Sequence, residues 1–214
     1  MPLRTGLALA ALALGACGGG EPVAGAGSDG PRTDVAPSDP ADFGALPDFR
    51  LIDQRGREVT RAGLLGRPLV MGALFTTCTG PCPSIARGLQ GLQEALSGTD
   101  CRIVVVSVDP ELDTPEVLAR YAERWQADPE RWLFLTGPEA EAHALVRAGL
   151  YLAVARAEGA APPGEQVTHD VRLLAVDRRG HRRGWYTGTD EVQLEKLARR
   201  MRHLAGEPAP EAPR

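Results

Sequence analysis

An almost continuous apolar run, Leu69 to Phe75, limits the folds that are open to this chain. Such a run is typical of a strand covered on both faces, as in a parallel sheet, rather than of a strand with one face in water. Two cysteines, Cys78 and Cys82, follow the run, and a helical apolar stripe follows them. The stripe residues are Ile85, Leu89, Leu92 and Leu96. The sequence therefore predicts a buried strand that turns into a helix at the two cysteines.

The alternation of strand and helix continues along the chain. A buried strand is expected over Ile103 to Val108, and a helix is expected from Asp113-Thr114-Pro115, where a capping residue precedes proline. Later strands are expected over 132–135, 150–155, 171–176 and 184–187, helices over 138–148 and 190–204, and a polar loop over 157–168. This order is thioredoxin-like, and it predicts an α/β, three-layer fold with a central mixed sheet and helices on both faces.

The two ends of the chain differ from its centre in composition. Residues 1–16 have the short apolar core of a signal peptide, and Leu14-Gly15-Ala16-Cys17 resembles a bacterial lipobox. This resemblance implies export and a lipid on Cys17, which would anchor the protein to a bacterial membrane with its domain in the periplasm or on the outer side. Residues 17–45 are then a flexible linker, 46–205 one folded domain and 206–214 a disordered tail, because both flanks lack the apolar residues of a core.

Composition argues against one broad class of function. The chain has 24 basic and 28 acidic residues, which give a formal net charge of −4. It has no basic patch interleaved with aromatic residues, so binding to nucleic acid is not expected. With Cys17 lipidated, three cysteines remain, and Cys101, at the start of a buried strand, is interpreted as a small apolar filler.

Cys78 and Cys82 allow two kinds of chemistry. A turn into a helix favours a thiolate, and a low-pKa thiolate beside a second thiol can carry out disulfide exchange. Redox pairs in this fold usually have two intervening residues, whereas this pair has three, and the wider loop suits chelation. Two thiolates and one imidazole favour Cu(I), with Cu(II) as an alternative. The candidate third ligand is His169, which precedes a predicted strand.

Four segments together resemble the Sco/SenC family of copper chaperones for cytochrome c oxidase. They are Phe75-Thr76-Thr77-Cys78-Thr79-Gly80-Pro81-Cys82-Pro83, Val106-Ser107-Val108-Asp109-Pro110-Glu111-Leu112-Asp113-Thr114-Pro115-Glu116, Leu135-Thr136-Gly137, and His169 before a strand. The resemblance implies that Cys78, Cys82 and His169 are copper ligands. It also implies that Asp113 assists metal transfer or partner contact, whereas capping of the following helix is the structural alternative for this residue.

The resemblance further implies a metallochaperone, rather than an enzyme, that delivers copper to the CuA centre in subunit II of cytochrome c oxidase. The alternative is a thiol–disulfide oxidoreductase, in which Cys78 and Cys82 form the redox pair that reduces the CuA cysteines or other exported thiols. Other copper chaperones or thiol reductants would then be further partners. A thiol peroxidase is disfavoured, because Phe75 stands where the peroxidase pattern has threonine.

The chain departs from the family at Thr79 and Thr168, where proline and aspartate are usual, and these changes bear on partner choice and copper affinity.

Overall fold

The computed structural model describes residues 41–157, 159, 161, 162 and 164–207. The predicted signal peptide, the lipidation site Cys17, most of the predicted linker and residues 208–214 lie outside the described residues. Within the described part, no helix has both the length and the hydropathy needed to cross a membrane.

The core of the structure is a mixed sheet whose strands lie in the order β2-β1-β5-β4-β3-β8-β9. These strands are β1 (Arg50–Asp53), β2 (Glu58–Thr60), β3 (Leu69–Leu74), β4 (Arg102–Ser107), β5 (Trp132–Thr136), β8 (Arg172–Val176) and β9 (Arg182–Thr187). The three central strands β3, β4 and β5 are parallel, and β1, β8 and β9 pair antiparallel to their neighbours. The predicted mixed sheet is therefore confirmed.

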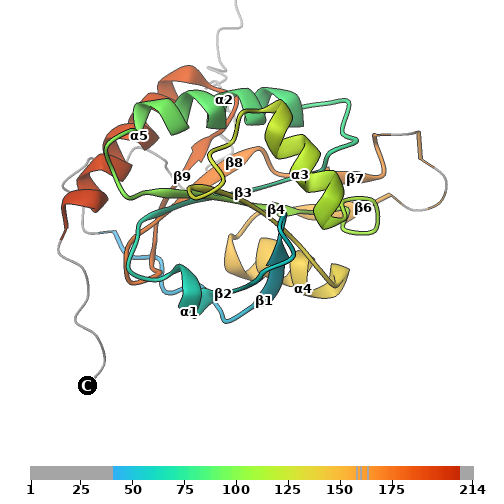
Figure 1. Ribbon diagram of the computed structural model, residues 1–214, viewed down its shortest axis with the longest axis horizontal. Helices are drawn as coiled ribbons and strands as arrows, with labels where there is room; N and C mark the ends of the chain where they lie inside the picture. Colours follow the sequence, from blue (N-terminus) through green and yellow to red (C-terminus); the bar gives the residue numbers. More distant parts are fainter. Residues whose placement is uncertain (1–40, 158, 160, 163, 208–214) are drawn as a thin grey trace, which may run out of the picture. The chain divides into compact units, whose positions relative to one another are not determined.

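Helices cover both faces of the sheet, as expected for central strands that are apolar on both sides. The helices are α1 (Arg61–Leu64), α2 (Cys82–Ala95), α3 (Pro115–Arg124), α4 (Glu139–Ala144), which continues as the π-helical turn η1 (Leu145–Gly149), and α5 (Glu191–Gly206). Figure 1 shows α2, α3 and α5 on one face and α1 and α4 on the other. Every residue of β3 and of β5 is buried, which explains why both strands are apolar except at Gly72 and Thr136.

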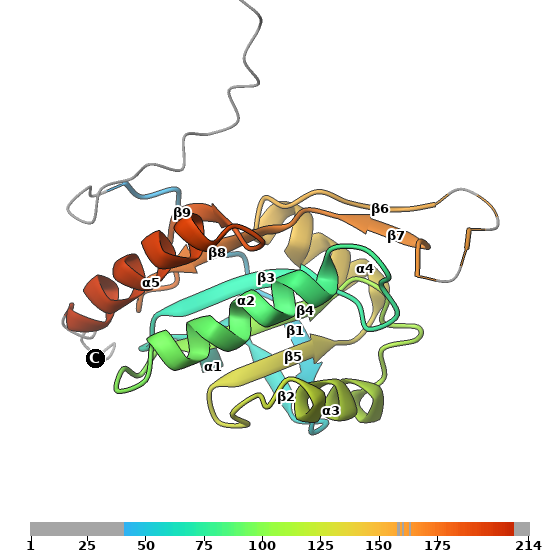
Figure 2. The same cartoon turned by 90° about the horizontal axis from the view of Figure 1, so that it is seen from above.

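A second, two-stranded sheet is the main difference from the predicted elements. It is the antiparallel hairpin of β6 (Val154–Arg156) and β7 (Val167–His169), in which Val154 pairs with His169. The predicted strand over 150–155 thus begins only at Val154, and the end of the predicted polar loop forms the first two residues of β7, Val167 and Thr168. Figure 2 shows this hairpin extending beyond the seven-stranded sheet, at the end where α2 begins.

The described residues of the predicted linker contact the folded domain. Ala45 forms a β-bridge with His181, and the backbone N–H of Phe43 donates to the carbonyl oxygen of Arg182. The ring of Phe43 also packs edge-on against Trp185, with their centroids 4.9 Å apart. Ordered structure therefore starts before Leu46, which differs from the flexible segment expected up to residue 45.

Candidate metal centre

The two cysteines lie on either side of the turn between β3 and α2. Cys82 is the first residue of α2 and is almost fully buried, whereas Cys78, in the loop before the helix, is only partly buried. Both thiols are free. The strand-to-helix turn predicted from the apolar pattern therefore presents one sulfur to the surface and one to the interior.

His169 reaches the same place from the end of β7. Its Nε2 atom lies 3.0 Å from the Sγ atom of Cys82, and its Nδ1 atom lies 2.8 Å from the carbonyl oxygen of Asp170. A carbonyl oxygen only accepts, so Nδ1 carries the proton and Nε2 is left with its lone pair directed at Cys82. A backbone acceptor of this kind is what fixes the ring orientation of metal-binding histidines.

Cys78, Cys82 and His169 together form a compact set of donor atoms. Their two sulfurs and one imidazole nitrogen all lie within 4.8 Å of one another, and no other such group of histidine, cysteine or acidic residues occurs among the described residues. Two soft thiolates and one imidazole suit Cu(I), so the donor set fits a copper ion. The structure thus brings together the three ligands predicted from the sequence.

Burial sets the protonation states of the inner two groups. It raises the pKa of the Cys82 thiol, and the neighbouring Cys78 thiol raises it further. Burial also lowers the pKa of His169, which keeps the imidazole neutral. The thiolate expected from the helix start is therefore not the resting form of Cys82, because the cost of desolvating a charge outweighs the helix dipole. A metal ion that binds here must displace the Cys82 proton.

Asp113 does not cap the helix that follows it. Thr114 is the N-cap of α3, because its side chain accepts from the backbone N–H of Val117. The Asp113 carboxylate is fully buried and accepts from the backbone N–H of Thr76 at 3.2 Å and from the hydroxyls of Thr76 and Ser107. Burial raises its pKa, and these hydrogen bonds lower it in part. Asp113 therefore fixes the start of the cysteine loop.

The comparison with known families matches this geometry. Residues 37–206 fit the family model of SCO1/SenC, which is most of the chain. The chain belongs to the SCO1/SenC family. Within this family, the SCO1 protein homolog of Bacillus subtilis strain 168 is 28% identical over 162 residues, which cover 74% of this chain and 81% of that protein.

Solved structures of SCO1/SenC proteins have the same fold. BsSco, described as a Sco-family cytochrome c oxidase assembly protein with a disulfide switch, is 26% identical, with a TM-score of 0.66 over 78% of this chain and 96% of that one. The structure of Bradyrhizobium japonicum ScoI with copper bound is 23% identical, with a TM-score of 0.64 over 75% of this chain and 99% of that one. The likeness to BsSco confirms the thioredoxin-like α/β fold.

Thr79, one of the two positions where this SCO1/SenC chain departs from the usual motif, lies against the hairpin loop. A Cβ atom added at Gly164 would lie 2.5 Å from the carbonyl oxygen of Thr77 and 2.7 Å from Cγ2 of Thr79. Gly164 also has a φ of +87°, which side chains rarely adopt. Glycine is therefore needed there both because no Cβ atom fits and because of this backbone conformation. The loop between β6 and β7 is therefore in contact with the cysteine loop. Thr168, the other departure, is exposed on β7.

Cys101 is remote from the candidate metal centre. It lies just before β4, whereas Cys78 follows the far end of the parallel neighbour β3, so the length of a six-residue strand, about 20 Å, separates them. Its thiol is buried and lies 3.6 Å from the carbonyl oxygen of Met201. The structure agrees with the interpretation of Cys101 as a filler.

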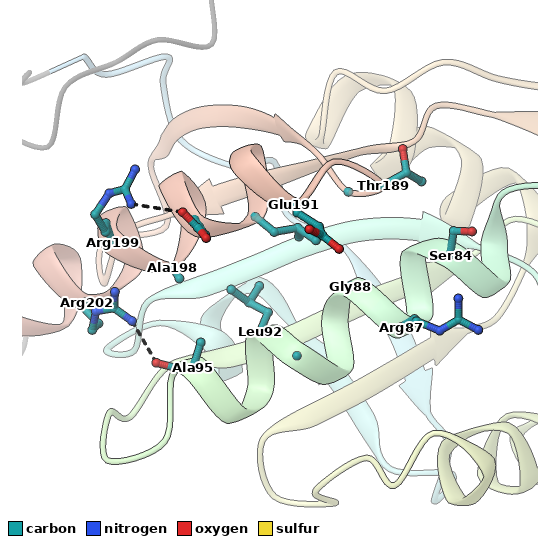
Figure 3. Close-up of a pocket in the computed structure, with 14 residues that line it drawn as sticks. Ser84, Arg87, Gly88, Leu92, Ala95, Thr189, Glu191, Ala198, Arg199 and Arg202 are labelled. Atoms are coloured by element: carbon teal, nitrogen blue, oxygen red, sulfur yellow. Dashed lines mark hydrogen bonds and ion pairs between the residues drawn. The ribbon is translucent and has the colours of Figure 1, made fainter.

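A cavity of about 710 Å³ lies along α2 but does not contain the donor atoms. Figure 3 shows it between α2 and α5, with Gly88 and Leu92 on one wall and Glu191 and Ala198 on the other. Neither cysteine of the candidate centre nor His169 lines it. The candidate metal centre therefore lies at the start of α2, outside this cavity.

The sequence analysis did not single out several residues that support the site. Ser107 and Thr76 hold Asp113, and Asp109 follows the same strand as Ser107. All three occur in segments that carried the family resemblance, which was the available signal. Arg156, on the hairpin opposite Val167, had no sequence signal at all.

Proposed function

We propose that this protein is a copper-binding metallochaperone that delivers copper to the CuA centre in subunit II of cytochrome c oxidase. The observation that carries the proposal is the cluster of two sulfurs and one imidazole nitrogen within 4.8 Å. Support comes from the copper-bound structure of Bradyrhizobium japonicum ScoI and from the assembly role stated for BsSco. A centre with three ligands, one of them the partly exposed Cys78, suits transfer, because incoming thiols can replace one donor at a time.

Attachment to a membrane belongs to the same proposal. A lipid on Cys17, followed by a linker, would hold the domain close to a membrane-embedded oxidase and raise the effective concentration of the two partners. The support is the lipobox-like sequence Leu14-Gly15-Ala16-Cys17. The domain would then act on the periplasmic or outer side of the membrane.

Copper binding is tested by titrating the reduced protein with Cu(I) against a competing chelator. We expect one copper per chain. Loss of a residue that only supports a metal ligand weakens metal binding about 10–100-fold. His169→Ala removes a ligand itself, so it should weaken Cu(I) binding by more than this. Cys101→Ala is the matched control, since it removes a thiol at the opposite end of β4, and it should bind like the wild type. Unchanged stoichiometry and affinity in His169→Ala would show that the three-ligand site is wrong.

Delivery needs its own measurement. Copper-loaded protein is mixed with the metal-free CuA domain of subunit II, the two are separated, and the copper on each is measured. Transfer from the wild type supports the proposal. Retention of all copper on the loaded protein, with a CuA domain that takes up free Cu(I), contradicts delivery while leaving copper binding in place.

A second candidate function is thiol–disulfide exchange, favoured by the two sulfurs that lie within 4.8 Å. The more accessible Cys78 thiolate would attack a partner disulfide and release one partner thiolate. Cys82 would then attack the mixed disulfide, leaving a Cys78–Cys82 disulfide and a reduced partner. Disulfide reductase activity that survives in His169→Ala and disappears in Cys78→Ser would support this role.

A further inference from the structure

The hairpin of β6 and β7 carries His169 but has no pairing with the seven-stranded sheet. An isolated two-stranded hairpin is at best marginally stable in water. The position of His169 against Cys82 therefore depends on contacts that hold the hairpin to the rest of the domain. The contact of Gly164 with the cysteine loop is one of these, and the side chain of Arg156 provides another.

Arg156 joins the hairpin to two elements of the main domain. Its guanidinium lies 2.9 Å from Oδ1 of Asp109, just after β4, and 3.2 Å from Oε1 of Glu139 in α4. Asp109 is almost fully buried, and its Oδ2 atom has no hydrogen-bond partner among the described residues. An unpaired charge on a buried carboxylate costs much free energy. The pairing of Arg156 with Asp109 therefore matters more than an ordinary surface salt bridge.

The same interactions continue as far as the cysteine loop. The backbone N–H of Asp109 donates to Oγ of Ser107, and the Ser107 hydroxyl donates to Asp113. Asp113 in turn accepts from Thr76, two residues before Cys78. A continuous set of polar contacts thus runs from Arg156 on β6, the strand that pairs with β7, to the loop that carries Cys78.

We propose that Arg156 is a positioning residue for the copper centre, which holds the β6–β7 hairpin, and with it His169, against the cysteine loop through Asp109 and Glu139. The proposal rests on the copper-binding function proposed above. Its physical basis is pre-organisation: an anchored hairpin has less conformational freedom to lose when the imidazole becomes a ligand. Arg156 pairs with Asp109 and Glu139 rather than with the donor atoms, so we expect it to act on copper mainly through the placement of His169.

The first test uses the metal-free protein and measures amide hydrogen exchange. Arg156→Ala should speed exchange about tenfold or more at the hairpin amides, including Ala157 and Asp170, which donate to Gln166 and Ala153. Exchange in β3 and β4 should stay unchanged. Arg50→Ala is the matched control, because it removes an exposed arginine that pairs with Glu58 on the outer strands, and it should leave the hairpin unaffected. Unchanged exchange at the hairpin in Arg156→Ala would overturn the anchoring.

The second test measures Cu(I) affinity in a double-mutant cycle. Arg156→Ala should weaken binding about 10–100-fold, as loss of an outer-shell partner does. In the His169→Ala background the same substitution should cause little further loss, because its effect passes through His169. An equal loss in both backgrounds would overturn the proposal and indicate a general structural effect.

Milder variants keep the proposal testable if Arg156→Ala folds poorly. Arg156→Lys should recover part of the affinity, since lysine can pair with Asp109 but cannot bridge both carboxylates with a planar fork. Glu139→Gln leaves the Asp109 pair in place and should give a smaller loss in the same direction. Wild-type affinity in both variants would contradict the role of Arg156. If the wild type itself fails to bind copper, the proposed function fails, while the exchange measurement still decides whether Arg156 anchors the hairpin.

Discussion

Cys82 begins a helix, where the dipole favours a thiolate, yet burial raises the pKa of its thiol. Asp113 shows a similar conflict between local position and environment. It stands beside a helix start, but its neighbour Thr114 takes the capping role, and Asp113 turns into the interior. At the scale of a single residue, the solvent around a group and its hydrogen-bond partners therefore decide its chemistry more than its place on an element.

Asp113→Asn tests the buried hydrogen-bond network around this residue. The carboxylate accepts from three donors on Thr76 and Ser107, and an amide would turn an NH₂ group towards at least one of them. We expect a loss of about 1–3 kcal/mol in the free energy of unfolding, measured by urea titration. Asp190→Asn is the matched control, because Asp190 does cap α5 and asparagine caps equally well. Equal, small effects of the two substitutions would contradict the buried network.

At the scale of elements, α2 links the candidate metal centre to the rest of the domain. It begins with Cys82 and lies beside α5, and the cavity between the two helices separates them over part of their length. Two glycines on this helix differ sharply in their surroundings. A Cβ at Gly88 would lie 2.7 Å from the carbonyl oxygen of Gly188 and 2.8 Å from Cδ1 of Leu194, whereas a Cβ at Gly91 would meet open space.

Substitution of these two glycines by alanine should therefore have opposite effects. Gly91→Ala should stabilise the protein by about 0.5–1 kcal/mol, since it removes the helix penalty of glycine without a clash. Gly88→Ala should destabilise it by about 1–3 kcal/mol, because it forces α5 away from α2. The free energies of unfolding of the two variants in urea check this directly. Stabilisation by Gly88→Ala would show that α5 moves aside at little cost.

At the scale of the whole molecule, the parallel sheet decides which groups meet. The carboxyl ends of β3 and β4 lie at one edge, so the cysteine loop and the residues after β4 are neighbours there. The hairpin adds His169, which is 87 residues from Cys82 in sequence. Cys101 lies at the opposite edge, where α5 packs over it and the carbonyl of Met201 is near its thiol. The same sheet thus assembles one thiol pair and isolates the third thiol.

The thiol of Cys101 makes a pH-dependent contribution to the free energy of unfolding. Burial raises the pKa of Cys101 above its ordinary value of 9.0, so the unfolded chain loses this proton at a lower pH than the folded chain. The contribution is fully present below pH 9.0 and declines as the pH rises above it. Between pH 9 and 10, the free energy of unfolding of wild type should fall more steeply than that of Cys101→Ala, by up to about 1.4 kcal/mol per pH unit. Parallel curves for the reduced, metal-free proteins would contradict this.

Most of the fold follows from local patterns in the sequence. The apolar runs of β3 and β4, the helical stripes and the caps at Thr114 or Asp190 depend on residues a few positions apart, and so they can be predicted from spacing alone. The hairpin of β6 and β7 was only partly predicted, because its strands are three residues each and give almost no periodic signal.

The α/β order, the cysteine turn and, through the family motifs, the three candidate ligands can be predicted from the sequence. Three features became clear only in the folded structure: Asp113 holds Thr76, Arg156 joins the hairpin to Asp109, and burial raises the pKa of the Cys82 thiol instead of favouring its thiolate. The physical reason is the range of the interactions. Strand and helix patterns are set by neighbours along the chain, whereas burial and ion pairing are set by segments that meet only after the sheet has formed.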